Sequence, residues 1–249
     1  MDRRQLEKSN IDNLTHLWKL MGANKYEISE GNFVYASTHW PNRVWPDWGY
    51  YPTPQDIETV LSKIERNTQN IVIPIWHTTD TQIDSALYKN RYRFSFEQTA
   101  MALSLRGKME HAKNGLELKQ VTTDEHAIIW TDIASQSFGY PIHAPTIQKI
   151  VGITKLKLIL AYLNTIPVGT GMLFENSDVV GIHMVGVAPA YRRQGIARKI
   201  MHNFINICHK SDSAYATLQA SAMAESLYER LGFEKQFSIV NFANSKFSD

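Results

Sequence analysis

The sequence is short of several features that mark particular classes of protein. It contains a single cysteine, Cys208, which excludes an internal disulfide and is typical of a reducing compartment. Its longest apolar-leaning stretch, at residues 156–163, contains Lys157 and is too short to cross a bilayer. The first ten residues are polar and charged, so we expect no secretory signal. These absences predict a cytoplasmic protein without a membrane partner.

The chain also lacks an excess of either charge. Its 26 lysines and arginines nearly balance its 24 aspartates and glutamates, which leaves a net charge of +2. Such a balance gives no strong field toward nucleic acid or an anionic membrane, so neither is expected as a partner. The nine histidines are dispersed and form no convincing ligand set, so we predict no metal site. Hydrophobic residues make up 43% of 249 residues, which is enough for substantial cores.

The first half of the chain is rich in aromatic residues. Helices are expected at 6–21, 54–67 and 81–89, and strands at 32–37, 70–76 and 96–105. Between them, prolines alternate with Trp40, Trp45, Trp48, Tyr50 and Tyr51. Proline removes amide donors and restricts the residue before it, so this cluster is predicted to be an ordered loop. Its aromatic rings either pack an interdomain surface or close a pocket from the first half.

A polar segment with two glycines, residues 106–115, is predicted to be a linker. It would separate a domain at 1–105 from a domain at 116–249. In the second half we expect helices at 123–137, 145–154, 195–210 and 222–231. Strands are expected at 116–121, 157–163, 167–175, 179–187, 214–219 and 237–242. Cys208 lies near the end of an amphipathic helix and is interpreted as buried filler.

The segment 185–197 combines a strand end, a basic turn and the start of a helix. Pro189 stops strand pairing, and Gly195 precedes a run with helical spacing. The first amides of a helix lack internal partners and carry the positive end of its dipole, so they can bind a phosphate. Gly195 would let that phosphate approach the backbone. The same pattern also fits a surface turn with solvated arginines before an amphipathic helix.

The pattern Arg192-x-x-Gly195-x-Ala197, after Val187-x-Pro189, resembles the acetyl-CoA signature of the GNAT superfamily of N-acetyltransferases. The resemblance implies an α+β fold, with a mostly antiparallel central sheet flanked by helices. It implies acetyl-CoA as the acyl donor and assigns the amide of Val187 to the thioester carbonyl. The implied cofactor-binding residues are Val185, Gly186, Val187, Arg192, Arg193, Gln194, Gly195, Ile196, Ala197, Arg198, Ser221 and Ala224.

A second part of the resemblance lies at residues 221–233, which end in Leu-Tyr-x-x-x-Gly-Phe. Tyr228 matches the tyrosine that protonates the departing thiolate of CoA in this family. Ser221 stands where many members have asparagine, and it could cap the helix and bind pantetheine. Ala224 matches a small residue against which the cofactor packs. Without the first motif, Tyr228 is better explained as a packed aromatic residue on an amphipathic helix.

The first half carries a short echo of the second motif. Residues 87–94 (LYKNRYRF) resemble residues 227–233 (LYERLGF), which places Tyr88 where Tyr228 stands. We therefore predict that residues 1–105 form a degenerate GNAT-like domain in tandem with the catalytic one. Residues 38–55 lack the arginine–glycine pattern, so this half is not expected to hold a pyrophosphate.

Acetyl transfer also needs a neutral amine, and a base or a chain of waters must take its proton. Strict alternation along 182–187 would place His183, Val185 and Val187 on one face of the strand. His183 is therefore the leading candidate base, and it matches a catalytic histidine of one family member. Glu175 is the weaker alternative. The alternative is that His183 is a histidine hydrogen-bonded in the core or facing solvent, without a catalytic role.

The turn at 137–143 falls where the family borders its acceptor pocket, so Phe138, Tyr140 and His143 are candidate acceptor contacts. The resemblance thus predicts transfer of an acetyl group to a primary amine of a small molecule or a peptide. The alternative is a non-catalytic sensor that keeps the fold and binds CoA. The sequence leaves the oligomeric state open, a homodimer included.

Overall fold

The computed structural model describes residues 1–37, 39–48, 53–63, 71–76, 85, 87–107 and 115–244. The helices it describes are α1 (Arg3–Leu20), α2 (Pro54–Lys63), α4 (Asp124–Phe138), α5 (Ala144–Ile150), α6 (Ile196–Cys208) and α7 (Glu225–Arg230), with a short 3₁₀ helix η1 (Pro189–Tyr191). The strands of the first half are β1 (Asn24–Ser29), β2 (Asn32–Ala36), β3 (Val44–Pro46), β4 (Val72–Trp76) and β5 (Tyr92–Ser104). Those of the second half are β6 (Leu116–Gln120), β7 (Leu156–Leu163), β8 (Ile166–Asn176), β9 (Val179–Val187), β10 (Tyr215–Ser221) and β11 (Glu234–Asn244).

Eight strands form one sheet in the order β4–β11–β5–β10–β9–β8–β7–β6. Neighbours in this sheet run antiparallel except β9 and β10, which run parallel. A smaller sheet has the order β1–β2–β3. The mostly antiparallel sheet flanked by helices confirms the expected fold class.

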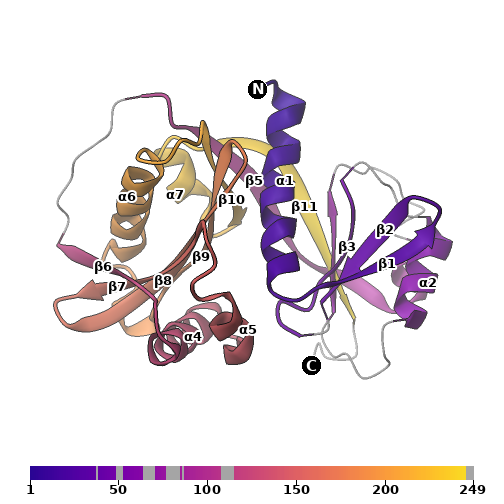
Figure 1. Cartoon of the computed structure of the whole chain (residues 1–249), viewed down its shortest axis with the longest axis horizontal. Helices are drawn as coiled ribbons and strands as arrows, with labels where there is room; N and C mark the ends of the chain where they lie inside the picture. Colours follow the sequence, from indigo (N-terminus) through magenta and orange to yellow (C-terminus); the bar gives the residue numbers. More distant parts are fainter. Residues whose placement is uncertain are drawn as a thin grey trace.

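Strand β5 belongs to the first half of the chain but lies between β10 and β11 of the second half. Figure 1 shows β5 and β11 running together from one lobe to the other, with α1 between the lobes. The main sheet therefore continues through both halves. The division at 105 and 116 stays a prediction, and residues 108–114 of the expected linker lie outside the described residues.

Two apolar cores cover the two faces of this sheet. Helices α4 and α5 pack on one face together with the last turns of α1, and α6 and α7 pack on the other. On α6, Ile196, Ile200 and Phe204 are buried at helical spacing, as the sequence predicts. The ring of Phe204 lies where a side chain at Gly171 of β8 would stand. Helix α6 is thereby fixed against β8 and β9.

Most predicted elements are confirmed to within a few residues, but two strands were missed. Strand β1 was not expected, and the short β3 lies inside the predicted aromatic loop. The expected helix at 81–89 falls largely outside the described residues, as do Tyr50 and Tyr51. Among the described residues, no helix has the length and apolar character needed to cross a membrane.

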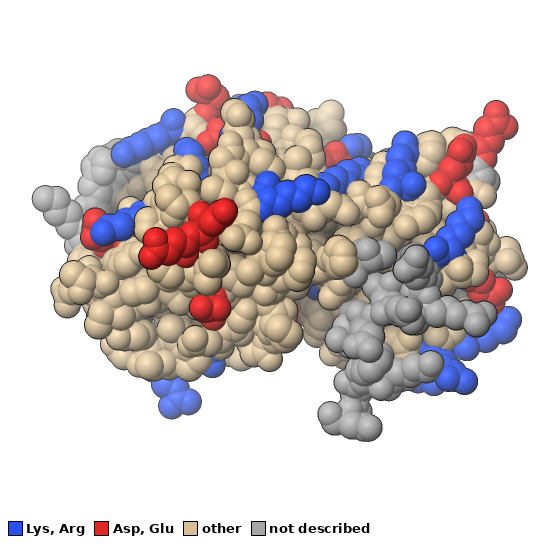
Figure 2. All heavy atoms as spheres, turned by 60° about the horizontal axis from the view of Figure 1, so that its bottom comes forward, with Lys and Arg blue, Asp and Glu red and all other residues tan. Residues whose placement is uncertain are grey.

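The three described tryptophans of the aromatic cluster pack inside the molecule. Trp40 joins the core beneath α4 and α5, and Trp45 is 1% exposed between Trp18 and Tyr35. Trp48 lies 6.2 Å from the ring of Phe237 on β11. The cluster therefore joins the two halves. On the face shown in Figure 2, lysines and arginines are interspersed with acidic residues, as expected from the near-balanced charge.

Candidate active site

The turn before α6 has a backbone that leaves several amides facing outward. Gly195 is the N-cap residue of α6 with φ of 73°, and Arg193 has φ of 62°. No other atom lies within 4 Å of the place where a side chain at Gly195 would begin. The left-handed backbone at position 195 favours glycine, and Gly195 borders open space. The first amides of α6, which have no partner inside the helix, point into that space.

A groove of about 730 Å³ opens at this turn, between the start of α6 and helix α7. Four arginines line it, and together with the dipole of α6 they make it a site for a polyanion. The Nη2 atom of Arg192 also donates to the carbonyl of Ser137, 2.8 Å away, which ties the turn to the end of α4. The lining residues are Val187, Tyr191, Arg192, Arg193, Gly195, Ile196, Ala197, Arg198, His202, Leu227, Arg230 and Leu231.

Strands β9 and β10 separate on their way to this groove. They pair from Val179–Gly181 with Tyr215–Thr217, and β9 continues to Val187 without further pairing to β10. On the side of β9 that faces β8, the amide of Ala188 donates to the carbonyl of Val168. Backbone groups alternate in direction along an antiparallel ladder, so the amide of Val187 points away from β8 and into the gap. The gap therefore offers free backbone groups to a ligand.

A bulge in β9 overturns the prediction that His183, Val185 and Val187 share one face. Met184 has φ of 52°, and the register between β8 and β9 shifts at this point. The extra residue reverses the alternation. Val185 and Val187 consequently pack on the face of α6 and α7, whereas Met184 packs on the face of α4 and α5.

His183 points toward α1 and is buried in a polar network. Its Nε2 atom lies 2.8 Å from Oδ1 of Asn13, whose amide donates to the carbonyl of Phe174. Burial lowers the pKa of His183 to about 4, and a hydrogen bond with Gln219 offsets part of this decrease. Gln219 also donates to Asn10 of α1, 2.6 Å away. The imidazole of His183 is therefore neutral and enclosed at neutral pH.

Glu175, the alternative base, lies at the far end of the β8–β9 hairpin. It pairs in register with Val180, which is roughly 23 Å along the strand from Val187. Its carboxylate is also 3.6 Å from the ammonium group of Lys157. The hairpin thus carries Glu175 away from Val187, and its role as a base stays a prediction.

Tyr228 lies in the core beside the gap, on the same face of the sheet as Val185 and Val187. Burial raises its pKa to about 12, and its ring contacts Phe233 edge to face at 6.0 Å. None of the described residues forms a hydrogen bond with its hydroxyl. Helix α7 begins at Glu225 after Ala224, without a side-chain cap. The expected capping role of Ser221 is therefore wrong, since Ser221 ends β10 instead.

The loop between α4 and α5 brings the three predicted acceptor residues to one side of the molecule. Phe138 and Tyr140 are exposed, with ring centres 6.0 Å apart. His143 precedes α5, bonds Thr146 at 2.9 Å and stacks on His39 of the first half, 5.4 Å away. The loop thus meets the first half at a surface that remains open to solvent.

Sequence comparison bears directly on this half of the molecule. A family profile described as an acetyltransferase (GNAT) domain matches residues 124–249, just over half of the chain. The chain belongs to the GNAT acetyltransferase family. A search of curated proteins finds no match.

Solved structures of GNAT proteins share the fold. A GCN5-related N-acetyltransferase from Kribbella flavida superposes with a TM-score of 0.69 at 15% identity, covering 96% of this chain and 94% of that one. One from Sphaerobacter thermophilus gives 0.60 at 15% identity, covering 85% and 76%. A tandem GNAT protein from the clavulanic acid biosynthesis pathway gives 0.54 at 12% identity, covering 85% and 78%. These identities show a common fold alone.

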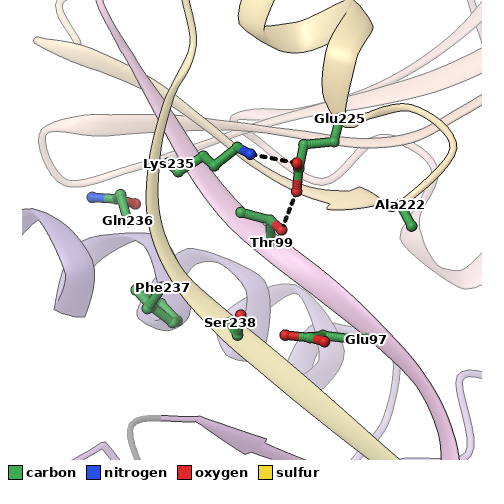
Figure 3. Close-up of a pocket in the computed structure, with 8 residues that line it drawn as sticks. All are labelled: Glu97, Thr99, Ala222, Glu225, Lys235, Gln236, Phe237 and Ser238. Atoms are coloured by element: carbon green, nitrogen blue, oxygen red, sulfur yellow. Dashed lines mark hydrogen bonds and ion pairs between the residues drawn. The ribbon is translucent and has the colours of Figure 1, made fainter.

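A second cavity of the GNAT domain, of about 400 Å³, is shown in Figure 3. Residues of β5, β11 and the start of α7 line it, and it shares no lining residue with the groove. Glu225 accepts from Thr99 and Lys235, each at 2.5 Å. The carboxylate of Glu97 also lines this cavity.

Two residues that sequence reasoning missed belong to the surroundings of this GNAT site. Asn13 holds His183, and Arg43 of the first half lies near Tyr140. Asn13 lies within a helix pattern, where a buried asparagine gives no signal. Arg43 lies between Trp40 and Trp45 in the aromatic cluster. A single charged residue among aromatic residues was the signal in the sequence that could have identified it. Cys208 is free and buried, as interpreted from the sequence. No group of metal ligands occurs among the described residues.

Proposed function

We propose that this protein transfers an acetyl group from acetyl-CoA to a primary amine. The proposal rests on one arrangement: the left-handed turn at Arg193 and Gly195, with its arginine-lined groove, leads directly into the gap between β9 and β10. The outward amides and four arginines suit the phosphates of CoA, and the free backbone groups of β9 suit an extended pantetheine arm. The bound cofactor supplies a thioester, whose carbonyl carbon the amine attacks.

The chain contributes charge stabilisation and a proton. The amide of Val187, turned into the gap, is placed to donate to the carbonyl oxygen as negative charge develops on it. Tyr228 remains protonated throughout the physiological range because its pKa is raised to about 12. Its unpaired hydroxyl is thus always available to donate to the departing thiolate. An ordinary thiol, with a pKa of about 8.5, is the stronger acid, so a proton passed from Tyr228 to the thiolate is replaced by the proton that the amine has released to water.

The proton on the amine goes to water in this proposal. An alkylammonium ion has a pKa of about 10, whereas the imidazole of His183 has a pKa of about 4. Transfer to that imidazole is strongly uphill, and the imidazole is 7% exposed. An amine that reaches the site from solvent at the open side of the α4–α5 loop can lose its proton to bulk solution first, and its neutral form then attacks without a buried base.

Calorimetry with CoA and release of free thiol test the proposal together. The wild-type protein should bind CoA saturably and release thiol only when an amine is present. Gly195→Glu should abolish binding, because its carboxylate would stand in the phosphate site, with the circular dichroism spectrum unchanged. Gly195→Ala is the matched control, which strains the left-handed residue without adding charge. Binding without amine-dependent turnover would favour a non-catalytic CoA sensor, and unchanged affinity of Gly195→Glu would refute the phosphate site.

A further inference from the structure

Arg43 has two guanidinium nitrogens that are shielded from solvent and lack hydrogen-bond partners. Its Nε and Nη1 atoms are buried without an acceptor, while the residue as a whole is half-buried. Within the described part of the chain, no carboxylate lies within ion-pairing distance of it. Burial lowers the pKa of Arg43 to about 10, so the group remains a cation at neutral pH. An unpaired buried charge is costly, and an anion from outside the chain would remove that cost.

The surroundings of Arg43 hold its guanidinium group in place between flat rings. The Cζ atom lies 5.8 Å from the ring centre of Trp18 on α1 and 5.7 Å from that of Phe96 on β5. Ser37 fixes the backbone of Arg43 from both sides, through its hydroxyl and its amide, each at 2.9 Å. A fixed, planar fork of donors is the geometry that binds a carboxylate through two parallel hydrogen bonds.

The same region holds a third unpaired donor. The indole Nε1 atom of Trp45 is buried without an acceptor. Trp45 lies in β3, two residues after Arg43, and its ring centre is 5.0 Å from that of Trp18. The α4–α5 loop, which carries Tyr140, borders this region, because His143 of that loop stacks on His39, four residues before Arg43. Donors thus gather here without a matching acceptor.

This region is connected to the gap by two rigid paths. Along α1, Asn13 bonds His183 beside the gap, and Trp18 lies one and a half turns further, roughly 8 Å along the helix axis. Along α4, Ser137 packs against Gly186, and Tyr140 follows three residues later. Both paths therefore place the surroundings of Arg43 beside α1 and α4, a few residues along each helix from a contact with β9.

We propose that Arg43 binds the carboxylate of the acceptor, so that the amine acetylated by this protein belongs to a small amino carboxylate. This inference rests on the proposed function and specifies its substrate class. Trp18 and Phe96 border the guanidinium group, the phenol of Tyr140 supplies a neutral donor, and the amine points toward the gap between β9 and β10.

Thiol release with matched acceptors tests the inference. The series runs from glycine through β-alanine and 4-aminobutyrate to 6-aminohexanoate, and each acid is compared with its own carboxamide at one acetyl-CoA concentration. At least one acid should exceed its carboxamide in kcat/KM by about 30-fold, the range of a charge-assisted hydrogen bond. Equal rates for acids and carboxamides throughout the series would overturn the inference without any variant.

Variants then assign the preference to Arg43. Arg43→Met should remove the preference while leaving the KM for acetyl-CoA and the carboxamide rate within about threefold, and Arg43→Lys should keep part of it. The control is Arg4→Met, which removes an exposed arginine of α1. Arg43→Met should also unfold at the same or a higher temperature, because it removes an unpaired buried charge. Equal slowing of both members of each pair would indicate a structural role instead and overturn the inference.

Direct binding separates this inference from the proposed function. If no amine is acetylated, the proposed function fails, and calorimetry with the same acids in the presence of CoA still decides the site. Saturable binding that Arg43→Met abolishes would support a carboxylate site, and absence of binding to the wild-type protein would overturn it.

Discussion

The buried imidazole of His183 should make this protein lose stability in mild acid. In the folded state the pKa of His183 is lowered from 6.5 to about 4, because burial disfavours the charged form. The unfolded chain, with an ordinary pKa, therefore binds a proton at a higher pH than the folded chain does. The resulting contribution is complete above pH 6.5 and is lost as the pH falls toward 4. The size of the pKa change corresponds to ~3 kcal/mol.

Replacing His183 with glutamine removes that titration and keeps an amide that can bond Asn13. At pH 7 the variant should be less stable by ~1–2 kcal/mol, the range for a buried hydrogen bond made imperfectly. At pH 4 the order should reverse, because only the wild-type protein pays for keeping the imidazole neutral. The acetylation rate should fall less than about tenfold, since water takes the proton in our proposal.

Guanidinium unfolding followed by circular dichroism, at a series of pH values from 4 to 7.5, measures this difference directly. His16→Gln, the same substitution at an exposed position of α1, is the control. Parallel stability curves for His183→Gln and wild type would refute the reasoning. A loss of 10²-fold or more in kcat at unchanged stability would restore His183 as the base.

Other substitutions test the remaining geometry. Tyr228→Phe should lower kcat by about 10²-fold with little change in acetyl-CoA affinity, measured by thiol release and calorimetry. It should also reduce the loss of stability between pH 10 and 12 that the raised pKa values of Tyr228 and Tyr92 predict for wild type. Gly181→Ala should destabilise the fold by ~1–3 kcal/mol in urea unfolding, because its methyl group would overlap Asn13 and His183. Gly107→Ala faces open space and should change stability by less than ~0.5 kcal/mol; equal effects of the two changes would contradict the packing described for α1. Cys208, whose pKa burial raises to about 12, should resist alkylation in the folded protein, and rapid labelling at pH 7 would contradict its enclosure.

The sequence predicted the elements whose signal is local. The turn at Gly195 and the buried stripe of α6 follow from a glycine and from helical spacing, and both are found in the structure. The order of strands in the second half followed in the same way. Such features depend on residues close together in the chain, which is why a single sequence suffices for them.

The parts that sequence reasoning missed depend on contacts between distant residues. A bulge at Met184 reverses the facing of β9, yet nothing in an apolar strand pattern distinguishes a bulged residue from a regular one. The burial of His183 comes from α1, which is far away in sequence. The unpaired state of Arg43 likewise exists only when β3, α1 and β5 are assembled. The functional interpretation of His183 changes for this reason.

The position of β5 has a consequence for how the chain can be divided and made. During synthesis β5 leaves the ribosome long before β10 and β11 are made. Both edges of β5 therefore stay unpaired until the end of the chain has been translated. A fragment that starts at residue 116 would lack the strand that pairs with both β10 and β11, although it would contain both sequence motifs of the second half. Co-expressing the severed halves, and asking whether they associate and regain solubility together, addresses the protein as one cooperative unit.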